Sequence, residues 1–150
     1  RRKGFFLFGE HARELISPES GLHFLQALAK ESENPASPLA VHWSEVAVLL
    51  NANPMSRDRV FQHGDSCLRK DQNGVDLNRN YPNHWSKSKS SPSDDTYGGP
   101  KALSEPETKF ITDFISNYKP DLFATVHSGT KAMFVPYGYI LKYYLNPEIE

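Results

Sequence analysis

The stretch that decides the fold is GFFLFGEHAREL, residues 4–15. It opens with a continuous apolar run rich in phenylalanine, residues 4–8, which is typical of a strand covered on both faces of a sheet. His11 then lies in the loop at the carboxyl end of this strand, three residues before Glu14. An imidazole and a carboxylate at this spacing can bind one divalent metal ion, with Arg13 between them. Such a pair is common by chance, so the prediction depends on further ligands elsewhere in the chain.

Size and composition indicate a single globular domain. The chain has 150 residues, of which 38% are hydrophobic and 23% are charged, and its formal net charge is -1. The basic cluster at residues 1–3 is more typical of a solvated terminus than of a nucleic-acid site. No apolar segment approaches the roughly 18 residues of a membrane-spanning helix. We therefore expect neither nucleic acid nor a membrane as a partner.

The single cysteine, Cys67, excludes a disulfide within these residues. His63 lies four residues before it, but no third group that could orient a thiol and an imidazole is evident in the sequence. A buried or loop cysteine is therefore favoured over a catalytic nucleophile.

The first helix is predicted over residues 18–31. Ser17 is a candidate N-cap, and Pro18 suits the first helical position. Apolar residues recur at helical spacing and predict that the helix faces a core; they are Leu22, Leu25, Leu28 and Ala29. After a turn-rich break, EVAVLL at residues 45–50 predicts a second strand.

Residues 51–101 are rich in Asn, Ser, Pro, Asp and Gly, and they predict no regular element. So long an irregular segment within a compact domain is usually functional or disordered. We expect residues 51–82 to be ordered and functional, and residues 86–95, which include a serine-lysine tract, to form a mobile surface loop.

A second helix is predicted over residues 105–118. It starts with a capping-box pattern in which Ser104 is the N-cap and Glu107 follows three residues later. One apolar face continues through Phe110, Ile111, Phe114, Ile115 and Tyr118. Lys119 and Pro120 end the helix, and DLFATVH at residues 121–127 predicts a buried strand. Alternating strands and helices predict an α/β fold in one domain.

The candidate functional residues follow the predicted strands. In open α/β sheets, binding and catalytic residues gather in the loops at the carboxyl ends of strands. His11 follows the first predicted strand, and His127 closes the third. A catalytic zinc ion often takes two His and one carboxylate and keeps a further position for water. His127 is thus the best candidate for the third ligand, although a buried histidine held by hydrogen bonds is the commoner role for such a residue.

Residues 67–82, CLRKDQNGVDLNRNYP, add groups that suit a substrate with a free carboxylate. The planar guanidinium of Arg79 can bind a carboxylate through two hydrogen bonds, and Asn78 is its neighbour. Arg69 can bring a second guanidinium to a metal-bound oxygen. For each arginine, a surface ion pair is the commoner role.

Five short segments also occur in the order of a known family. They are HARE at 11–14, LRK at 68–70, GVDLNRNYP at 74–82, HSG at 127–129 and PYGY at 136–139. Together they resemble the zinc metallocarboxypeptidases of the carboxypeptidase A/B type. The resemblance implies an α/β fold with a mixed central sheet and helices on both faces. It also implies one zinc ion (Zn2+) per site and a peptide or protein C-terminus as the substrate.

The resemblance assigns a role to each candidate residue. The zinc ligands that it implies are His11, Glu14 and His127. Asn78 and Arg79 would hold the terminal carboxylate of the substrate. Arg69 would stabilise the oxyanion that forms at the scissile carbonyl, and Arg13 would contact the peptide further from its end.

The resemblance also implies that the site is incomplete within residues 1–150. The family's general-base glutamate lies well beyond the HSG histidine, whereas the sequence continues for only 23 residues after His127. Glu148 and Glu150 are too close to His127 to match it and are interpreted as solvated charges. We expect a partial catalytic domain that lacks its natural start and its C-terminal part and is inactive alone. A secreted or vacuolar/lysosomal-type compartment is favoured by the family.

Two other functions remain compatible with the motifs. One is a non-catalytic relative of the same fold that binds metal and peptide but has lost the base. The other is a zinc-dependent deacylase that cleaves amides on the same scaffold. Asn78 and Arg79 argue against the deacylase, because they suit a substrate with a carboxylate.

Overall fold

The computed structural model describes residues 2–34, 36–37, 43–86 and 91–136. Some sequence predictions concern residues outside these ranges. They are the ones for Arg1, for residues 87–90 of the expected mobile loop, for residues 137–139 of the PYGY motif, and for Glu148 and Glu150.

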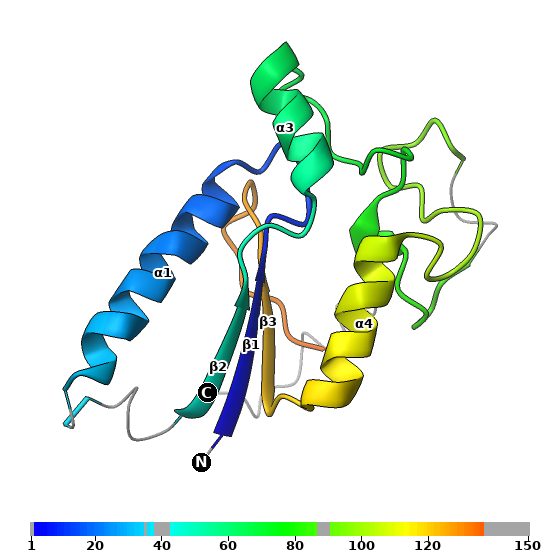
Figure 1. Ribbon diagram of the computed structural model, residues 1–150. Coiled ribbons are helices and arrows are strands. Elements are labelled where there is room, and N and C mark those ends of the chain that lie inside the picture. The colour runs from blue at the N-terminus through cyan, green and yellow to red at the C-terminus, as the bar shows by residue number, and fades with distance from the viewer. Residues whose placement is uncertain (1, 35, 38–42, 87–90, 137–150) are drawn as a thin grey trace.

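A three-stranded parallel sheet forms the centre of the described chain (Figure 1). β1 (Arg2–Phe8) lies between β2 (Trp43–Leu49) and β3 (Leu122–Val126). The strands predicted from the sequence are confirmed, with ends that differ by at most two residues. Because all three strands run in the same direction, their carboxyl ends meet at one edge of the sheet.

α4 (Pro106–Tyr118) covers one face of this sheet. Successive side chains of a strand point to opposite faces. Phe5 and Leu7 share one face of β1, and both are buried in a core that includes Ile111 of α4. The rings of Phe5 and Phe114 extend this contact, with centroids 4.8 Å apart.

α1 (Ile16–Ser32) covers the other face. Its Phe24 packs on Phe6 and Phe8, with ring centroids 4.6 Å and 6.3 Å away. Gly21 permits this approach, because a Cβ atom at that position would lie 2.8 Å from Cγ of Phe8. Helices therefore lie on both faces of the sheet, as the sequence predicts (Figure 1). The described strands contain only parallel pairs.

The apolar side of α1 is only partly buried. Leu25 and Leu28 line a groove of about 320 Å³ against Trp43 of β2. Leu22 is 45% exposed, so the prediction that it faces a core is wrong.

The start of α1 differs from the sequence prediction. The helix begins at Ile16, and Leu15 occupies the N-cap position that the sequence assigns to Ser17. The Ser17 hydroxyl donates to the carbonyl of Val126 at 2.6 Å and accepts from the N–H of Gly9 at 2.9 Å. The capping prediction for Ser17 is wrong because this hydroxyl joins the ends of β1 and β3.

The sequence does not predict α3 (Pro54–His63), which lies within the segment expected to be irregular. Its boundary signals are a proline at the first helical position and Gly64, in the left-handed conformation with φ of 68°, just after its end. The apolar periodicity of the sequence does not predict this helix, because only a narrow stripe of its surface is buried. Ser56 and Val60 are buried, whereas Phe61 is exposed.

α4 confirms the helix predicted over residues 105–118, but the predicted capping box is wrong. Glu105 is the N-cap. The Ser104 hydroxyl donates to Oε1 of Glu105 at 2.5 Å and accepts from Nδ2 of Asn80 at 2.9 Å. Ser104 therefore connects the helix to a neighbouring loop. Lys119 ends the helix in the left-handed region, with φ of 53°.

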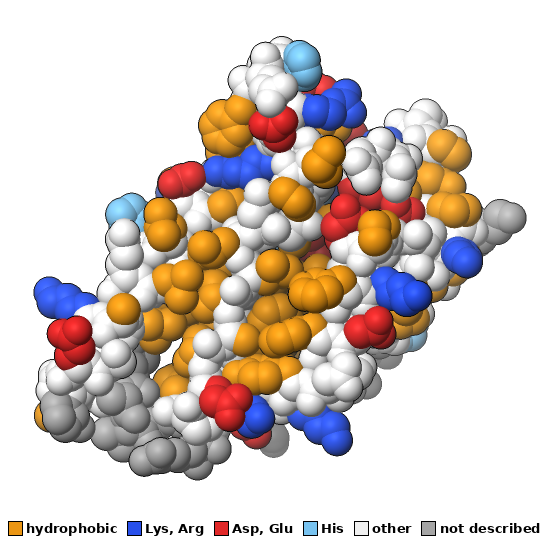
Figure 2. Space-filling view, in the orientation of Figure 1, with side chains coloured by type: hydrophobic (Ala, Val, Ile, Leu, Met, Phe, Trp, Pro, Cys, Tyr) orange, Lys and Arg blue, Asp and Glu red, His pale blue; other side chains and the backbone are white. Residues whose placement is uncertain are grey.

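β3 is more exposed than its apolar sequence predicts. Leu122 and Phe123 are 43% and 42% exposed, because β3 is an edge strand of the described sheet. Figure 2 shows hydrophobic side chains gathered over the strands between α1 and α4. The expectation that the strand at residues 121–127 is buried is therefore wrong for the described structure.

Two further expectations concern the surface. Cys67 is a free, exposed cysteine, which agrees with the loop position expected for it. The helices in the described ranges include none that is long and apolar enough to cross a membrane.

Gly21→Ala is expected to destabilise the protein by about 1–2 kcal/mol. Overpacking a core costs about 1–3 kcal/mol, and the better helix propensity of alanine offsets up to about 1 kcal/mol. The new Cβ would lie 2.8 Å from Phe8 and 3.0 Å from Leu50. We therefore expect the cost of overpacking to exceed the gain in helix propensity. Urea unfolding measures the difference. Gln26→Ala, at an exposed position of α1, is the matched control. Unchanged stability of Gly21→Ala would contradict the close contact.

Candidate metal centre

The turn after β1 carries His11 and Glu14. Gly9 begins this turn in the left-handed conformation, with φ of 68°, and a Cβ there would lie 2.8 Å from Cγ of Pro18. A glycine is therefore needed at this position. The N–H of Glu14 donates to the carbonyl of His11 at 3.2 Å, which closes the turn.

The structure brings His11, Glu14 and His127 together. Nδ1 of His11 lies 2.8 Å from Oε1 of Glu14, and Nδ1 of His127 lies 3.0 Å from Oε2 of Glu14. The two Nδ1 atoms are 3.1 Å apart. His127 reaches this point because β3 is the parallel neighbour of β1, with Val126 paired to Phe8.

The outer nitrogen of each histidine also has partners. Nε2 of His11 lies 3.1 Å from Oδ1 of Asp76. Nε2 of His127 lies 3.0 Å from Oγ1 of Thr125 and 3.3 Å from Oε2 of Glu10. These contacts hold both imidazole rings with Nδ1 directed into the cluster.

The sequence analysis assigns no role to Asp76 or Glu10. Asp76 lies inside the GVDLNRNYP segment, two residues before Asn78, and this proximity was a usable signal. Glu10 is 1% exposed, and its Oε1 accepts a hydrogen bond of 2.8 Å from the hydroxyl of Tyr81. Tyr81 is far away in the sequence, so only the fold shows that Glu10 is held in the site.

Hydrogen bonds control ionisation in the cluster. Burial alone would raise the pKa of Glu14, but hydrogen bonds with His11 and His127 hold this pKa far below its usual value. Burial alone would lower the pKa of His127, but hydrogen bonds with Glu10 and Glu14 raise it to about 9. Burial also opposes charging of His11, yet Asp76 and Glu14 raise its pKa. The hydrogen bonds of the cluster therefore favour an ionised Glu14 and raise the pKa of both histidines.

Arg69 lies at the edge of the cluster, with 14% of its side chain exposed. Its Nε donates to Oδ2 of Asp76 at 3.0 Å, and its Nη2 lies 2.9 Å from the same oxygen as an ion pair. Its Nη1 lies 3.3 Å from Nδ1 of His11. Burial alone would raise the pKa of Asp76, but His11 and Arg69 lower it. One buried carboxylate therefore positions both the histidine and the arginine.

Asn78 and Arg79 lie in a 3-10 turn, η1 (Leu77–Arg79), next to this cluster. The backbone N–H of Asn78 donates to Oδ1 of Asp76 at 3.0 Å. Arg79 is exposed, and its Nη1 donates to the carbonyl of Asn78 at 2.8 Å. Among the described residues, neither side chain has a hydrogen bond to the candidate metal ligands.

Arg13 is exposed and pairs with other surface groups. Its Nη1 donates to the carbonyl of Cys67 at 3.2 Å and lies 3.3 Å from Oδ2 of Asp95. Its observed contact is thus the surface ion pair that the sequence analysis gives as the commoner role for an arginine.

Asn80 is another residue that the sequence analysis does not single out. It is fully buried, and its amide joins the segment of Arg79 to the start of α4. Its Nδ2 donates to three oxygens, which belong to Gly98, Lys101 and Ser104. Its Oδ1 accepts from the N–H of Glu105 and the hydroxyl of Thr108.

The donor atoms fit a zinc ion. Two imidazole nitrogens and a carboxylate oxygen are a common ligand set of catalytic zinc, and zinc-bound histidines usually have a partner at the other nitrogen. Glu10, His11 and His127 form a second possible group, with ligand atoms within 4.8 Å of one another. Glu14 is the better carboxylate, because it contacts Nδ1 of both histidines. Glu10 contacts an outer nitrogen and Tyr81.

Sequence comparisons relate the chain to known enzymes. Residues 2–148 match the family model described as "Zinc carboxypeptidase". The chain is 36% identical to Zinc carboxypeptidase A 1 of Drosophila melanogaster over 151 residues, which cover 92% of this chain and 34% of the fly protein. The chain thus spans about a third of the length of the curated relatives that it matches first.

Solved structures show the same fold. The crystal structure of thrombin activatable fibrinolysis inhibitor (TAFI) matches with a TM-score of 0.75 and 26% identity, over 87% of this chain and 36% of that one. Murein-tripeptide amidase MpaA from Escherichia coli O157 matches with a TM-score of 0.51 and 26% identity, over 85% of this chain and 51% of that one. The predicted α/β fold with helices on both faces is confirmed.

The metal-free protein is expected to lose stability from His127 as the pH rises. The folded pKa of about 9 lies above the ordinary histidine value of 6.5, so the charged imidazole stabilises the fold. This contribution is complete below pH 6.5 and is lost as the pH rises through about 9. Urea unfolding of chelator-treated wild type and His127→Ala should differ most at the lower pH. His23→Ala, at an exposed position of α1, is the control. A difference that does not change with pH would contradict the assignment.

Proposed function

Because the chain belongs to the zinc carboxypeptidase family, we propose that the protein carrying it is a metallocarboxypeptidase that removes the C-terminal residue from peptides or proteins. One observation supports this proposal most strongly. Two imidazoles and a carboxylate converge beside a largely buried arginine at the carboxyl ends of parallel strands.

His11, Glu14 and His127 are the proposed zinc ligands. When bound, zinc lowers the pKa of a coordinated water to near neutrality and polarises a carbonyl group. Asp76 and Thr125 hold the histidine rings in the orientation that ligation requires. We assign the general base to none of the described residues. Glu10, the nearby buried carboxylate, already binds Tyr81 and His127.

Arg69 is proposed to stabilise the oxyanion that develops at the scissile carbonyl. Its guanidinium is fixed by a hydrogen bond and an ion-pair contact to Asp76, so little reorganisation is needed when the negative charge forms. The site around it is largely buried, which strengthens an electrostatic interaction. Replacing Asp76 is expected to disturb both Arg69 and His11.

Asn78 and Arg79 are proposed to bind the terminal carboxylate of the substrate. Arg79 is exposed, and its one hydrogen bond in the described structure is to a backbone carbonyl. Its planar guanidinium can therefore turn to a carboxylate and form two hydrogen bonds. Arg13 is proposed to contact the peptide further from its end, which would require it to leave Asp95.

A second candidate is hydrolysis of an amide that lacks an adjacent free carboxylate. The similarity to a murein-tripeptide amidase keeps this possibility open, whereas Arg79 favours a carboxylate-bearing substrate. A non-catalytic relative that binds zinc and peptide is the further alternative. We also propose a secreted or vacuolar/lysosomal-type compartment, from family membership.

Loss of a proposed ligand is expected to lower zinc affinity strongly. His11→Ala and His127→Ala in the full-length protein should each weaken zinc binding by more than about 100-fold, and Asp76→Asn by about 10- to 100-fold. Competition with a chelator measures the affinity, and His23→Ala is the matched control. Full zinc occupancy in both histidine variants would exclude this site.

Arg79→Ala is expected to raise KM for a peptide with a free C-terminus by about 10- to 150-fold, with a smaller change in kcat. A hydrogen bond to a charged group contributes about 1.5–3 kcal/mol. The change should largely abolish the preference over the same peptide with an amidated C-terminus. Arg59→Ala, an exposed arginine of α3, is the control.

The outcome of this assay separates the candidates. Efficient cleavage of the amidated peptide by the wild type would favour the amide hydrolase. Zinc binding without cleavage of either peptide would favour the non-catalytic relative.

A further inference from the structure

A second group of carboxylates lies away from the candidate metal centre. Asp71 belongs to the loop after Arg69, whereas Glu105 and Glu107 lie at the start of α4. Each offers a carboxylate oxygen, and these oxygens lie within 4.8 Å of one another. Figure 2 shows acidic side chains gathered near the N-terminal end of α4. We refer to Asp71, Glu105 and Glu107 as the acidic cluster.

Two oxygens of the acidic cluster are buried without a hydrogen-bond donor. Asp71 is 2% exposed, and its Oδ1 accepts from the N–H groups of Asn73 and Val75 at 2.9 Å and 2.8 Å. Its Oδ2 is buried and has no partner in the described structure. The same is true of Oε2 of Glu107. A buried carboxylate oxygen without a partner is energetically costly.

In the part of the chain that the structure describes, no positive side chain balances these charges. Among the described residues, Asp71, Glu105 and Glu107 form no ion pair with Lys, Arg or His. Glu105 accepts from Nδ2 of Asn73 and from the hydroxyl of Ser104, which are neutral donors. Burial, together with a side-chain hydrogen bond and charge repulsion with Glu105, raises the pKa of Asp71 to about 7. The cluster therefore needs either a bound cation or a shared proton.

We propose that the acidic cluster binds a hard divalent cation, with Ca²⁺ as the best fit. The donors are all oxygens, whereas zinc usually takes nitrogen or sulfur. Calcium–oxygen distances are about 2.3–2.6 Å, so two ligands of one ion lie at most about 5 Å apart. The separation of 4.8 Å or less within the cluster meets this limit. Water would complete the six to eight ligands that Ca²⁺ takes.

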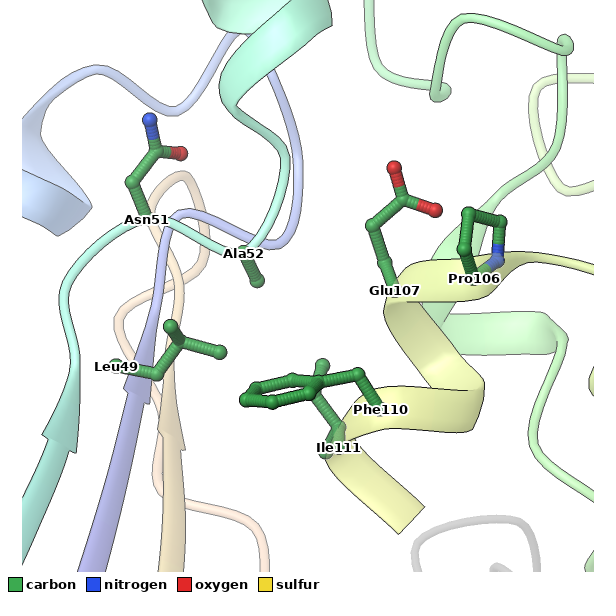
Figure 3. Close-up of a pocket in the computed structure, with 7 residues that line it drawn as sticks. All are labelled: Leu49, Asn51, Ala52, Pro106, Glu107, Phe110 and Ile111. Atoms are coloured by element: carbon green, nitrogen blue, oxygen red, sulfur yellow. The ribbon is translucent and has the colours of Figure 1, made fainter. Parts of the chain in front are cut away.

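A cavity lies on the Glu107 side of the cluster. It has a volume of about 280 Å³ and lies between α4 and the turn at Asn51 and Ala52 (Figure 3). Its other lining groups are mainly apolar, and Glu107 points along its edge. Glu107 therefore belongs both to the edge of this cavity and to the acidic cluster.

Binding at the acidic cluster would stabilise the segment that carries Arg69 and Arg79. Asp71 organises the start of this segment, because its backbone N–H donates to the carbonyl of Val75 at 2.8 Å. Val75 directly precedes Asp76, which holds His11 and Arg69. The cation would thus join this loop to α4 and act as a structural ion, separate from the catalytic zinc.

Thermal unfolding of the full-length, metal-depleted protein in Ca²⁺ at constant ionic strength tests the proposal. Calcium modules with weak sites have Kd values near about 1 mM, so a titration to about 10 mM covers them. At that concentration Tm is expected to rise by about 3–6 °C. Asp71→Asn and Glu107→Gln, each as a single substitution, should abolish this increase in Tm. Asp113→Asn, which removes a charge from an exposed position of α4, should keep it.

Two comparisons make the outcome decisive. His127→Ala should keep the Ca²⁺ response, because it alters only the zinc site. The proposal is overturned if Ca²⁺, Mg²⁺ and Mn²⁺ leave Tm of the wild type unchanged, since a shared proton would then neutralise the carboxylates. It is equally overturned if Glu107→Gln and Asp71→Asn respond to Ca²⁺ as the wild type does.

Discussion

The parallel pairing of β1 with β3 is the constraint on which the candidate metal centre depends. It places Phe8 beside Val126, so the chain emerges from both strands at the same edge of the sheet. His11 and His127 therefore meet although 116 positions separate them. A parallel pair needs a long crossover connection, and here that connection supplies Arg69, Asp76 and α4. A shift of one residue in register would turn the following side chains to the opposite face.

Charge balance organises the rest of the site. Asp76 is buried, and its two oxygens contact an imidazole, a guanidinium and a backbone N–H. Asp71 lies in the same loop and is also buried, but its partners are two neutral N–H groups and the carboxyl of Glu105, with no positive side chain among the described residues. The two carboxylates thus differ in how their charge is compensated. This difference separates the family's metal centre from the proposed cation site.

Sequence patterns predict the elements better than their ends. The strands and the helix at residues 105–118 follow from apolar periodicity, because packing on the sheet requires apolar side chains at regular spacing. Ser17 and Ser104 fail as N-caps, since their hydroxyls bond to distant groups instead. α3 lacks a wide apolar face, and only its proline and Gly64 indicate it. Local rules hold where no tertiary contact competes for the same side chain.

The sequence by itself determined the order of the motifs and, through the family resemblance that those motifs carry together, the candidate ligands His11, Glu14 and His127. It also determined the family, whose model matches nearly the whole chain. Only the tertiary structure decided the roles of Asp76, Glu10 and Asn80, and the meeting of Asp71 with α4. Those contacts join residues far apart in the chain, so their energies depend on burial and direction that no local pattern encodes.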